Sequence, residues 1–162
     1  MLTLSLVIVA LAQDPAVDDS SDIVATRVIR APVERVFEQM LDPRAIAPIA
    51  PSTCMRKWAF QETADGEERF QVVYLAELFR RKLKATVTRV DAPRSFDWDH
   101  KGNKGFVTRF RFAEVEGGTS VSMHTYIAAP PKPFRNYYAN KVQPRWTDCY
   151  DRLLEAVADS IE

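Results

Sequence analysis

Apolar and polar residues alternate with a period of two through much of the chain, which predicts β-strands. The clearest case is segment 105–129, where phenylalanines alternate with arginines and a Gly-Gly pair interrupts the pattern. Gly117 and Gly118 can adopt the positive φ that a two-residue hairpin turn requires. Glu116 is therefore expected to pair with Thr119. The segment predicts a hairpin with one apolar face and one wet face.

Counting outward from that turn gives the expected cross-strand pairs of each face. The apolar face, which Phe106 shares, is predicted to pair Glu114 with Val121, Phe112 with Met123, Phe110 with Thr125, and Thr108 with Ile127. The wet face is predicted to pair Arg109 with Tyr126, Arg111 with His124, and Ala113 with Ser122. A slip of one residue would place both arginines among apolar side chains, so the two faces are well defined.

The N-terminal part of the pattern predicts a strand at 22–30 followed by two short helices. Pro32 suits a first helical position, and Asp42 can cap a second helix that begins at Pro43. The stripe of the first helix consists of Val33, Val36, Phe37, Met40 and Leu41.

Further strands follow in series. Asp65-Gly66 marks a second hairpin, and a three-residue loop would pair Trp58 with Val72, Phe60 with Phe70, and Arg56 with Tyr74. In the next segments Leu83, Ala85 and Val87 share one face, and Phe96 and Trp98 alternate with Asp97 and Asp99. This alternation places both aspartates on the wet face, where we interpret them as surface charges.

The chain ends in a pattern of helical spacing. Trp146, Tyr150, Leu153, Leu154, Val157 and Ile161 form one apolar stripe, opposite acidic and basic residues. Pro144 within the segment is expected to kink or divide the helix. The predicted order is thus one strand, two short helices, about six strands and a long helix.

This order, with particular local residues, resembles the START-like superfamily, also called SRPBCC, which includes birch-pollen-allergen-type and polyketide cyclase/dehydrase-like proteins. The resemblance rests on VIRAPVERVFEQMLDP after the first strand, VTRVDAPRSFDWD in mid-chain, EVEGGTSVSMHTY at the last hairpin and the closing amphipathic helix. These segments are structural landmarks, and none is a catalytic signature. The resemblance implies an α+β helix-grip fold over residues 22–162, in which a curved antiparallel sheet of about seven strands wraps around the C-terminal helix.

It also implies an apolar cavity between the sheet and the helix. Large aromatic side chains on such a concave face are what a small-molecule cavity would have, although each of them would also serve as core packing. Thr125, Thr108 and Tyr74 could supply the polar contacts. The candidate ligand-binding residues are Trp58, Phe60, Phe70, Val72, Tyr74, Phe96, Trp98, Phe106, Phe110, Phe112, Met123, Thr125, Ile127 and Tyr138.

The sequence has few residues that are candidates for catalytic groups or metal ligands. His124 is predicted to point outward, and His100 is interpreted as a loop histidine, with the cavity rim as the alternative. No histidine or cysteine pair has the spacing of a zinc site, and no Gly-rich phosphate loop is present, so we expect no metal and no cofactor.

The charge balance limits the kinds of partner that the protein can be expected to bind. The chain of 162 residues has 22 basic and 22 acidic side chains, which argues against nucleic acid and limits membrane contact to a transient one.

Residues 1–12 are apolar and end in a small-x-small pattern, and an acidic linker follows at 13–21. This favours a signal peptide and export to the periplasm or the exterior, with a cytoplasmic location as the alternative. Cys54 and Cys149 fit either one disulfide or two inert thiols, and the oligomeric state stays open.

Three functions are consistent with these observations. The first is non-catalytic binding or transport of a hydrophobic small molecule such as a lipid, an isoprenoid or an aromatic compound. The second is a cyclase- or dehydratase-like cavity enzyme, with Tyr74, Tyr126, Tyr138 or His100 as acid or base. The third is a protein-interaction module, which would need an exposed apolar patch. We favour the first, because the pattern places no titratable group firmly in the cavity.

Overall fold

The computed structural model describes residues 23–75, 81–100, 106–126 and 132–161. The predicted signal peptide and acidic linker at 1–21 lie outside the described residues. The strands are β1 (Ile23–Ile29), β2 (Met55–Glu62), β3 (Glu68–Tyr74), β4 (Arg81–Asp91), β5 (Ser95–Asp99), β6 (Val107–Val115) and β7 (Gly118–Tyr126). The helical elements are α1 (Val33–Leu41), α2 (Pro43–Ile46), η1 (Lys132–Phe134), α3 (Arg135–Tyr137), η2 (Tyr138–Val142) and α4 (Gln143–Ile161).

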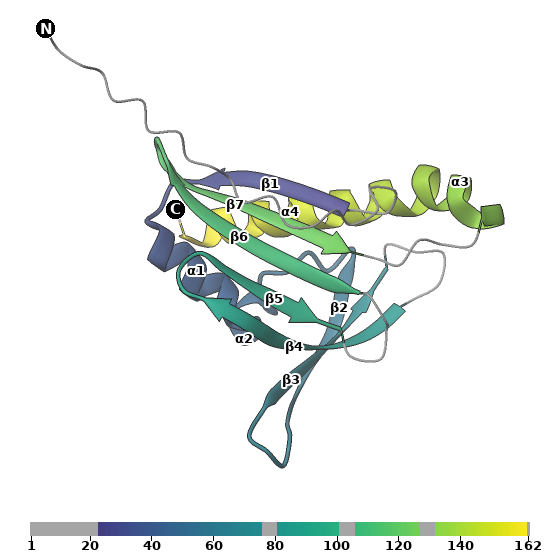
Figure 1. Ribbon diagram of the computed structural model, residues 1–162, viewed down its shortest axis with the longest axis horizontal. Coiled ribbons are helices and arrows are strands. Elements are labelled where there is room, and N and C mark those ends of the chain that lie inside the picture. Colours follow the sequence, from purple (N-terminus) through teal and green to yellow (C-terminus); the bar gives the residue numbers. More distant parts are fainter. Residues whose placement is uncertain (1–22, 76–80, 101–105, 127–131, 162) are drawn as a thin grey trace, which may run out of the picture.

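The described strands form one antiparallel sheet in the order β1-β7-β6-β5-β4-β3-β2. The sheet is curved, and α4 runs along its concave face (Figure 1). The short helices α1 and α2 connect β1 to β2, and α1 contacts β6, β7 and α4 at one end of the molecule. The predicted α+β helix-grip fold is confirmed.

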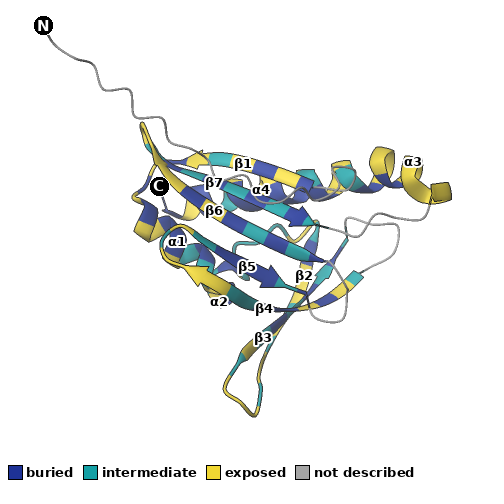
Figure 2. Ribbon diagram, viewed as in Figure 1, coloured by how far each residue is buried: buried dark blue, intermediate teal, exposed yellow. Residues whose placement is uncertain are grey.

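Alternating burial along the strands shows which face meets α4. Every second residue of β7 is buried, and the inward stripe of α4 is buried along its length, whereas α3 is exposed (Figure 2). The predicted stripe of Trp146, Tyr150, Leu153, Leu154, Val157 and Ile161 is confirmed. No helix in the described ranges is both long and apolar enough to cross a membrane.

The β6–β7 hairpin has the predicted faces but a different register. Val115 pairs with Gly118, so the turn residues are Glu116 and Gly117, and each predicted pair is wrong by two positions. Phe110 faces Met123, and Arg109 faces His124. A shift of two keeps every side chain on its face, which is why the faces were predicted correctly.

Gly118 belongs to the strand because β1 passes close to it. A Cβ atom at Gly118 would lie 2.1 Å from the carbonyl oxygen of Ile29, a distance that no side chain can occupy. The second glycine is therefore required by packing against β1, whereas Gly117, with a φ of 88°, serves the turn.

The β2–β3 hairpin combines one confirmed pair with a bulge. Phe60 faces Phe70 as predicted, but the register shifts between Arg56 and Ala59, so Met55 rather than Arg56 faces Tyr74. Trp58 lies in this bulge, where Lys57 and Trp58 together stand opposite Val72, so a simple pairing of Trp58 with Val72 is not confirmed. Lys57 has a φ of 52°, which allows the extra residue to be accommodated. As a result Met55, which the sequence pattern left out, is buried in the core.

The helix boundaries follow the predicted signals closely. Pro32 precedes the first residue of α1, one position earlier than expected, and the stripe of α1 is buried except for the half-buried Leu41. Asp42 caps α2 as predicted, because its carboxylate accepts a hydrogen bond of 2.8 Å from the Arg44 backbone N–H.

The C-terminal helical segment is divided next to Pro144. Residues 138–142 are a π-helix, in which the Gln143 N–H donates to the Tyr138 carbonyl, and α4 begins at Gln143. Proline has no N–H to donate to the preceding turn, so the change of helix type removes the conflict. A disulfide joins Cys54, before β2, to Cys149 in α4.

Candidate functional site

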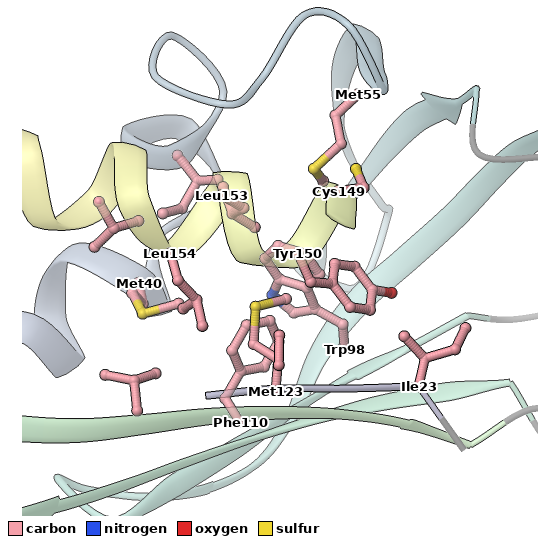
Figure 3. Packing of buried hydrophobic residues seen from close by; sticks show 14 of the residues in the cluster. Ile23, Met40, Met55, Trp98, Phe110, Met123, Cys149, Tyr150, Leu153 and Leu154 are labelled. Carbon is pink, nitrogen blue, oxygen red and sulfur yellow. The ribbon is translucent and has the colours of Figure 1, made fainter. Parts of the chain in front are cut away.

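Four buried polar side chains meet in the interior between α4 and the sheet. Thr108 of β6 and Thr125 of β7 are cross-strand partners, and their hydroxyl oxygens are 2.8 Å apart. Tyr150 projects from α4 toward the sheet (Figure 3), and its hydroxyl accepts a hydrogen bond of 2.9 Å from Thr125. His100, just after β5, lies 3.4 Å from the Thr108 hydroxyl through Nε2. We call these four residues the polar cluster.

Further polar atoms lie around the polar cluster without a hydrogen-bond partner. Within the described residues these are the Tyr74 hydroxyl, the Trp98 and Trp146 indole nitrogens and Nδ1 of His100. All four side chains are at most 1% exposed, so water does not reach them at the surface. The Tyr74 ring is 4.5 Å from Trp146 and 6.5 Å from His100, measured between centroids. Because a buried polar atom without a partner costs free energy, this arrangement is suited to a ligand that completes it.

Burial keeps the titratable members of this region uncharged. Burial, and secondarily the Arg81 guanidinium, lowers the pKa of His100 to about 3, so the imidazole is neutral at physiological pH. Burial raises the pKa of Tyr150 to about 12, although hydrogen bonds from Thr108 and Thr125 act in the opposite direction. Burial also raises the pKa of Tyr74, and the neighbouring Tyr150 adds to this effect.

Aromatic rings enclose the rest of this interior. Trp98 contacts Phe110 and Phe70 edge to face, with centroids 4.6 and 5.1 Å apart, and Phe96 stacks on Phe110 at 4.5 Å. Such ring contacts are favourable beyond the burial of area. The interior therefore combines an uncharged polar region with a wall of aromatic carbon.

Two places on the surface lie next to this interior. A hollow of about 490 Å³ opens between the α1–α2 region and β3–β4, with Leu41, Pro43, Phe70, Val87 and Val90 among its walls. At the other end of the sheet, η1, α3 and η2 extend beyond the strands (Figure 1). There Phe134 is 59% exposed, whereas Tyr138 is buried, so this segment presents one aromatic side chain outward and another inward.

Most predicted site residues face this interior, and their role as ligand contacts stays a prediction. Trp58 and Phe60 lie on the edge strand β2 and are only half-buried, although both pack against the core. Ile127 lies outside the described residues. The candidates that are buried here are Phe70, Val72, Tyr74, Phe96, Trp98, Phe106, Phe110, Phe112, Met123, Thr125 and Tyr138.

The structure corrects the interpretation of two polar residues. His100 lies just after β5, outside the strands, but it is not exposed: its side chain is 1% exposed and its ring is 4.4 Å from Phe106. Asp97 is on the predicted face but is not a surface charge, since it is 3% exposed. Its carboxylate is covered by Arg109 and Arg89, which bind it at 3.1 and 3.5 Å. His124 is on the outer face as predicted, where it stacks on Tyr126.

Tyr150 is the functional candidate that sequence reasoning missed. Its place in an apolar stripe made it look like ordinary core. A signal was available, because Thr108 and Thr125 are predicted on the inward face and Tyr150 has the one hydroxyl group in the helix stripe. Tyr126, considered as an acid or base, is excluded from this interior by its position on the outer face.

Fold and interior together define a helix-grip protein with a largely aromatic inner face. The sequence matches the model of the family described as polyketide cyclase / dehydrase and lipid transport over residues 21–162. The chain belongs to this family. No curated protein matches the chain.

Solved structures share the fold at low sequence identity. TTHA0849 from Thermus thermophilus has a TM-score of 0.69 and 18% identity, with 85% of this chain and 94% of that chain covered. The KanY protein (ms6282), solved by NMR, has a TM-score of 0.70 and 20% identity, with 86% and 95% covered. CV1439 from Chromobacterium violaceum has a TM-score of 0.61 and 17% identity, with 87% and 97% covered. At these identities the similarity concerns the fold. Family and fold support a protein that binds hydrophobic ligands.

Proposed function

We propose that the protein binds and carries a hydrophobic small molecule between α4 and the sheet, without catalysing a reaction. The observation that carries the proposal is the set of unpartnered polar atoms within an aromatic interior. The apolar part of the ligand would gain about 25 cal/mol per Å² that it removes from water. Its polar end would lie at the polar cluster.

The unpartnered atoms also define the polar end of the ligand. The indole N–H groups of Trp98 and Trp146 can only donate, and the Tyr74 hydroxyl is available as a further donor. A ligand that satisfies them must bring hydrogen-bond acceptors. Since these donors are themselves uncharged, a carbonyl or ether oxygen suits them better than a charged carboxylate. We propose a neutral lipid, isoprenoid or aromatic compound that has such an oxygen at one end.

The second candidate is a cyclase or dehydratase that uses the same side chains as acid or base. General acid–base catalysis is most effective when the pKa of the group lies near the working pH. The pKa of His100 is lowered to about 3 and that of Tyr150 is raised to about 12. Neither value favours proton transfer at neutral pH, which supports the carrier over the enzyme.

The direct test is native mass spectrometry of the purified protein, followed by titration with the fluorescent ketone prodan. We expect a co-purifying small molecule and saturable prodan binding that quenches tryptophan emission. Trp98→Phe keeps an aromatic ring but removes one donor, and should weaken prodan binding. Asp99→Asn, the adjacent position on the other face, is the matched control and should not. Turnover of a ketone substrate that Tyr150→Phe abolishes would contradict the carrier.

We further propose that the protein works in an oxidising compartment after export. The Cys54–Cys149 disulfide supports this, because structural disulfides persist mainly outside the cytosol. Protein isolated from its native source without reductant and denatured in the presence of a maleimide should show no free thiol. Labelling of both cysteines would contradict the proposal.

A further inference from the structure

The face of the sheet that is turned away from α4 carries a polar hollow of about 560 Å³. It lies outside the aromatic interior, and β4, β5, β6 and β7 all contribute to it. Small side chains form part of its lining and arginines dominate the rest. The lining residues are Arg89, Asp91, Arg94, Ser95, Asp97, Arg109, Arg111, Phe112, Ala113, Ser120 and Ser122.

The register of the sheet explains why the face is hollowed here. Arg111 has Ser95 of β5 as its partner on one side and Ser122 of β7 on the other, and Ala113 faces Ser120 in the next pair. Because these neighbours are short, they leave space beside the Arg111 guanidinium. They also place two hydroxyl groups next to it, which can donate to the same oxygen atoms.

A buried carboxylate fixes the arginines at one side of the hollow. Asp97 accepts hydrogen bonds from Arg109 Nε at 3.1 Å and from an Arg89 guanidinium nitrogen at 3.5 Å. Arg89 has a φ of 49° and lies where the β4–β5 register shifts between Thr88 and Asp91. Bulges re-aim side chains, and unfavourable backbone conformations of non-glycine residues concentrate at functional sites. The bulge thus brings Arg89 toward Asp97 at a conformational cost.

The lining has a net positive charge. Four arginines face two aspartates, an excess of two positive charges in a chain that is neutral overall. Asp91 is bound by Arg94 at 3.4 Å, and Asp97 lies between Arg89 and Arg109. Both lining carboxylates are therefore adjacent to arginine, and the lining as a whole keeps its net positive charge.

We propose that this hollow binds a small molecule through a phosphate group. Guanidinium groups bind phosphate oxygens through paired N–H donors, and serine hydroxyls add further donors at the same place. The volume is in the range of small-molecule pockets and exceeds the needs of a free phosphate ion. The protein would then have two independent ligand sites on opposite faces of one sheet.

The test is a titration of the full chain with phenyl phosphate at constant ionic strength, followed by NMR of the backbone amides. We expect saturable shifts at β5, β6 and β7 around Arg111, and weaker binding of inorganic phosphate. Arg111→Gln should weaken phenyl phosphate binding at least tenfold. The matched control is Lys84→Gln, which removes an exposed positive charge from β4 away from the hollow and should change the affinity less than twofold.

The outcomes separate the two sites. Prodan binding should be unchanged in Arg111→Gln, so a failed phosphate titration does not affect the proposed carrier function. Equal affinity of the Arg111→Gln variant and the original chain would overturn the phosphate site. Equal losses in the Lys84→Gln variant would do the same, because they indicate non-specific charge attraction. Equal affinity for inorganic and phenyl phosphate would overturn the small-molecule part of the proposal.

Discussion

The C-terminal and N-terminal halves of α4 cover very different parts of the interior. We call them the apolar end and the polar end. Around Leu153 and Leu154 the helix packs on α1 and the sheet, where Phe37 lies edge to face with Phe96 and Phe112. These side chains have no polar atoms, and Figure 3 shows Leu153, Leu154 and Met40 at this end. One helix turn earlier, Tyr150 enters the polar cluster. The first region can be complete without a ligand, whereas the second contains donors without partners.

The disulfide belongs to the second region. Cys149 precedes Tyr150 in the chain and is bonded to Cys54, 95 residues away, in the segment before β2. Tyr150 is therefore held by a covalent tether as well as by packing. A group that must meet a ligand benefits from such positioning, because less freedom is lost on binding. We therefore expect one end of α4 to stabilise the fold and the other to serve the proposed binding.

The largest effect is expected at the apolar end. Leu153→Ala should lower the free energy of unfolding by about 2–5 kcal/mol, because the removed methyl groups leave a cavity in a fully packed region. Urea denaturation measures the loss. Prodan affinity of the folded variant should stay within threefold.

The exposed residue Asp151, two positions earlier in α4, gives the matched control. Asp151→Ala should change the free energy of unfolding by less than about 0.5 kcal/mol. If Leu153→Ala abolished prodan binding while the protein remained folded, the division of α4 into two functions would be wrong.

The next effect is the pH dependence of stability that His100 of the polar cluster causes. The pKa of His100 is 6.5 in the unfolded chain and about 3 in the folded one, so between these values the unfolded state binds the extra proton. The contribution of His100 to stability is complete above pH 6.5 and is lost as the pH falls toward 3. The slope is at most about 1.4 kcal/mol per pH unit for one proton.

His100→Asn removes this titration, so the difference between the two stability curves isolates it from the carboxylates. The urea midpoints of the two proteins, measured from pH 7.5 to pH 4, should converge as the pH falls. Only the original chain loses stability through protonation of His100 in the unfolded state. Parallel curves would mean that His100 takes up its proton at the same pH in the folded and the unfolded chain. This would contradict an uncharged imidazole in the polar cluster.

The sequence pattern predicted the faces of the strands better than the identity of the site. Side-chain parity survives a shift of two residues, so the inward positions of Phe110 and Met123 were correct although their pairing was not. The bulge at Lys57 could not be predicted, because it depends on how β2 crosses β3 and not on local alternation. Alternation also predicted which face of the sheet Asp97 lies on, but it did not predict that Asp97 is buried.

Burial depends on what covers a residue. Arginines from β4 and β6 cover Asp97, and neighbouring rings from β3 and from Phe106 enclose His100. These contacts join segments far apart in the chain, and alternation within one segment has no information about them. Tyr150 was missed for a related reason, because its hydroxyl meets Thr108 and Thr125 only once the helix is placed against β6 and β7.

A more specific effect is expected from removing one oxygen atom at the polar end. Tyr150→Phe leaves Thr108 and Thr125 bonded to each other and should cost about 1 kcal/mol of stability, the net value of one hydrogen bond. Prodan has a carbonyl acceptor, and its affinity should fall about tenfold, as for the loss of about 1.4 kcal/mol. Fluorescence titration measures both this loss and the emission shift.

Two controls make this result specific. N-phenylnaphthylamine has no carbonyl, so Tyr150→Phe should leave its affinity within twofold. Tyr126→Phe removes the same atom from a tyrosine on the outer face and should not affect either probe. Equal losses for the two probes would show that Tyr150 acts by shape alone and not through its hydroxyl.

The smallest effect is expected at η2, which we predict to close one side of the ligand site. Tyr138 and Val142 are the buried residues of this π-helical segment, whereas the adjacent Tyr137 is 43% exposed on α3. Tyr138→Ala should weaken prodan binding about threefold, or roughly 0.7 kcal/mol, because it opens one side of the site while α4 keeps its packing. The stability loss should remain well below that of Leu153→Ala. Tyr137→Ala should change neither quantity, and a loss as large as that of Leu153→Ala would place Tyr138 in the structural region instead.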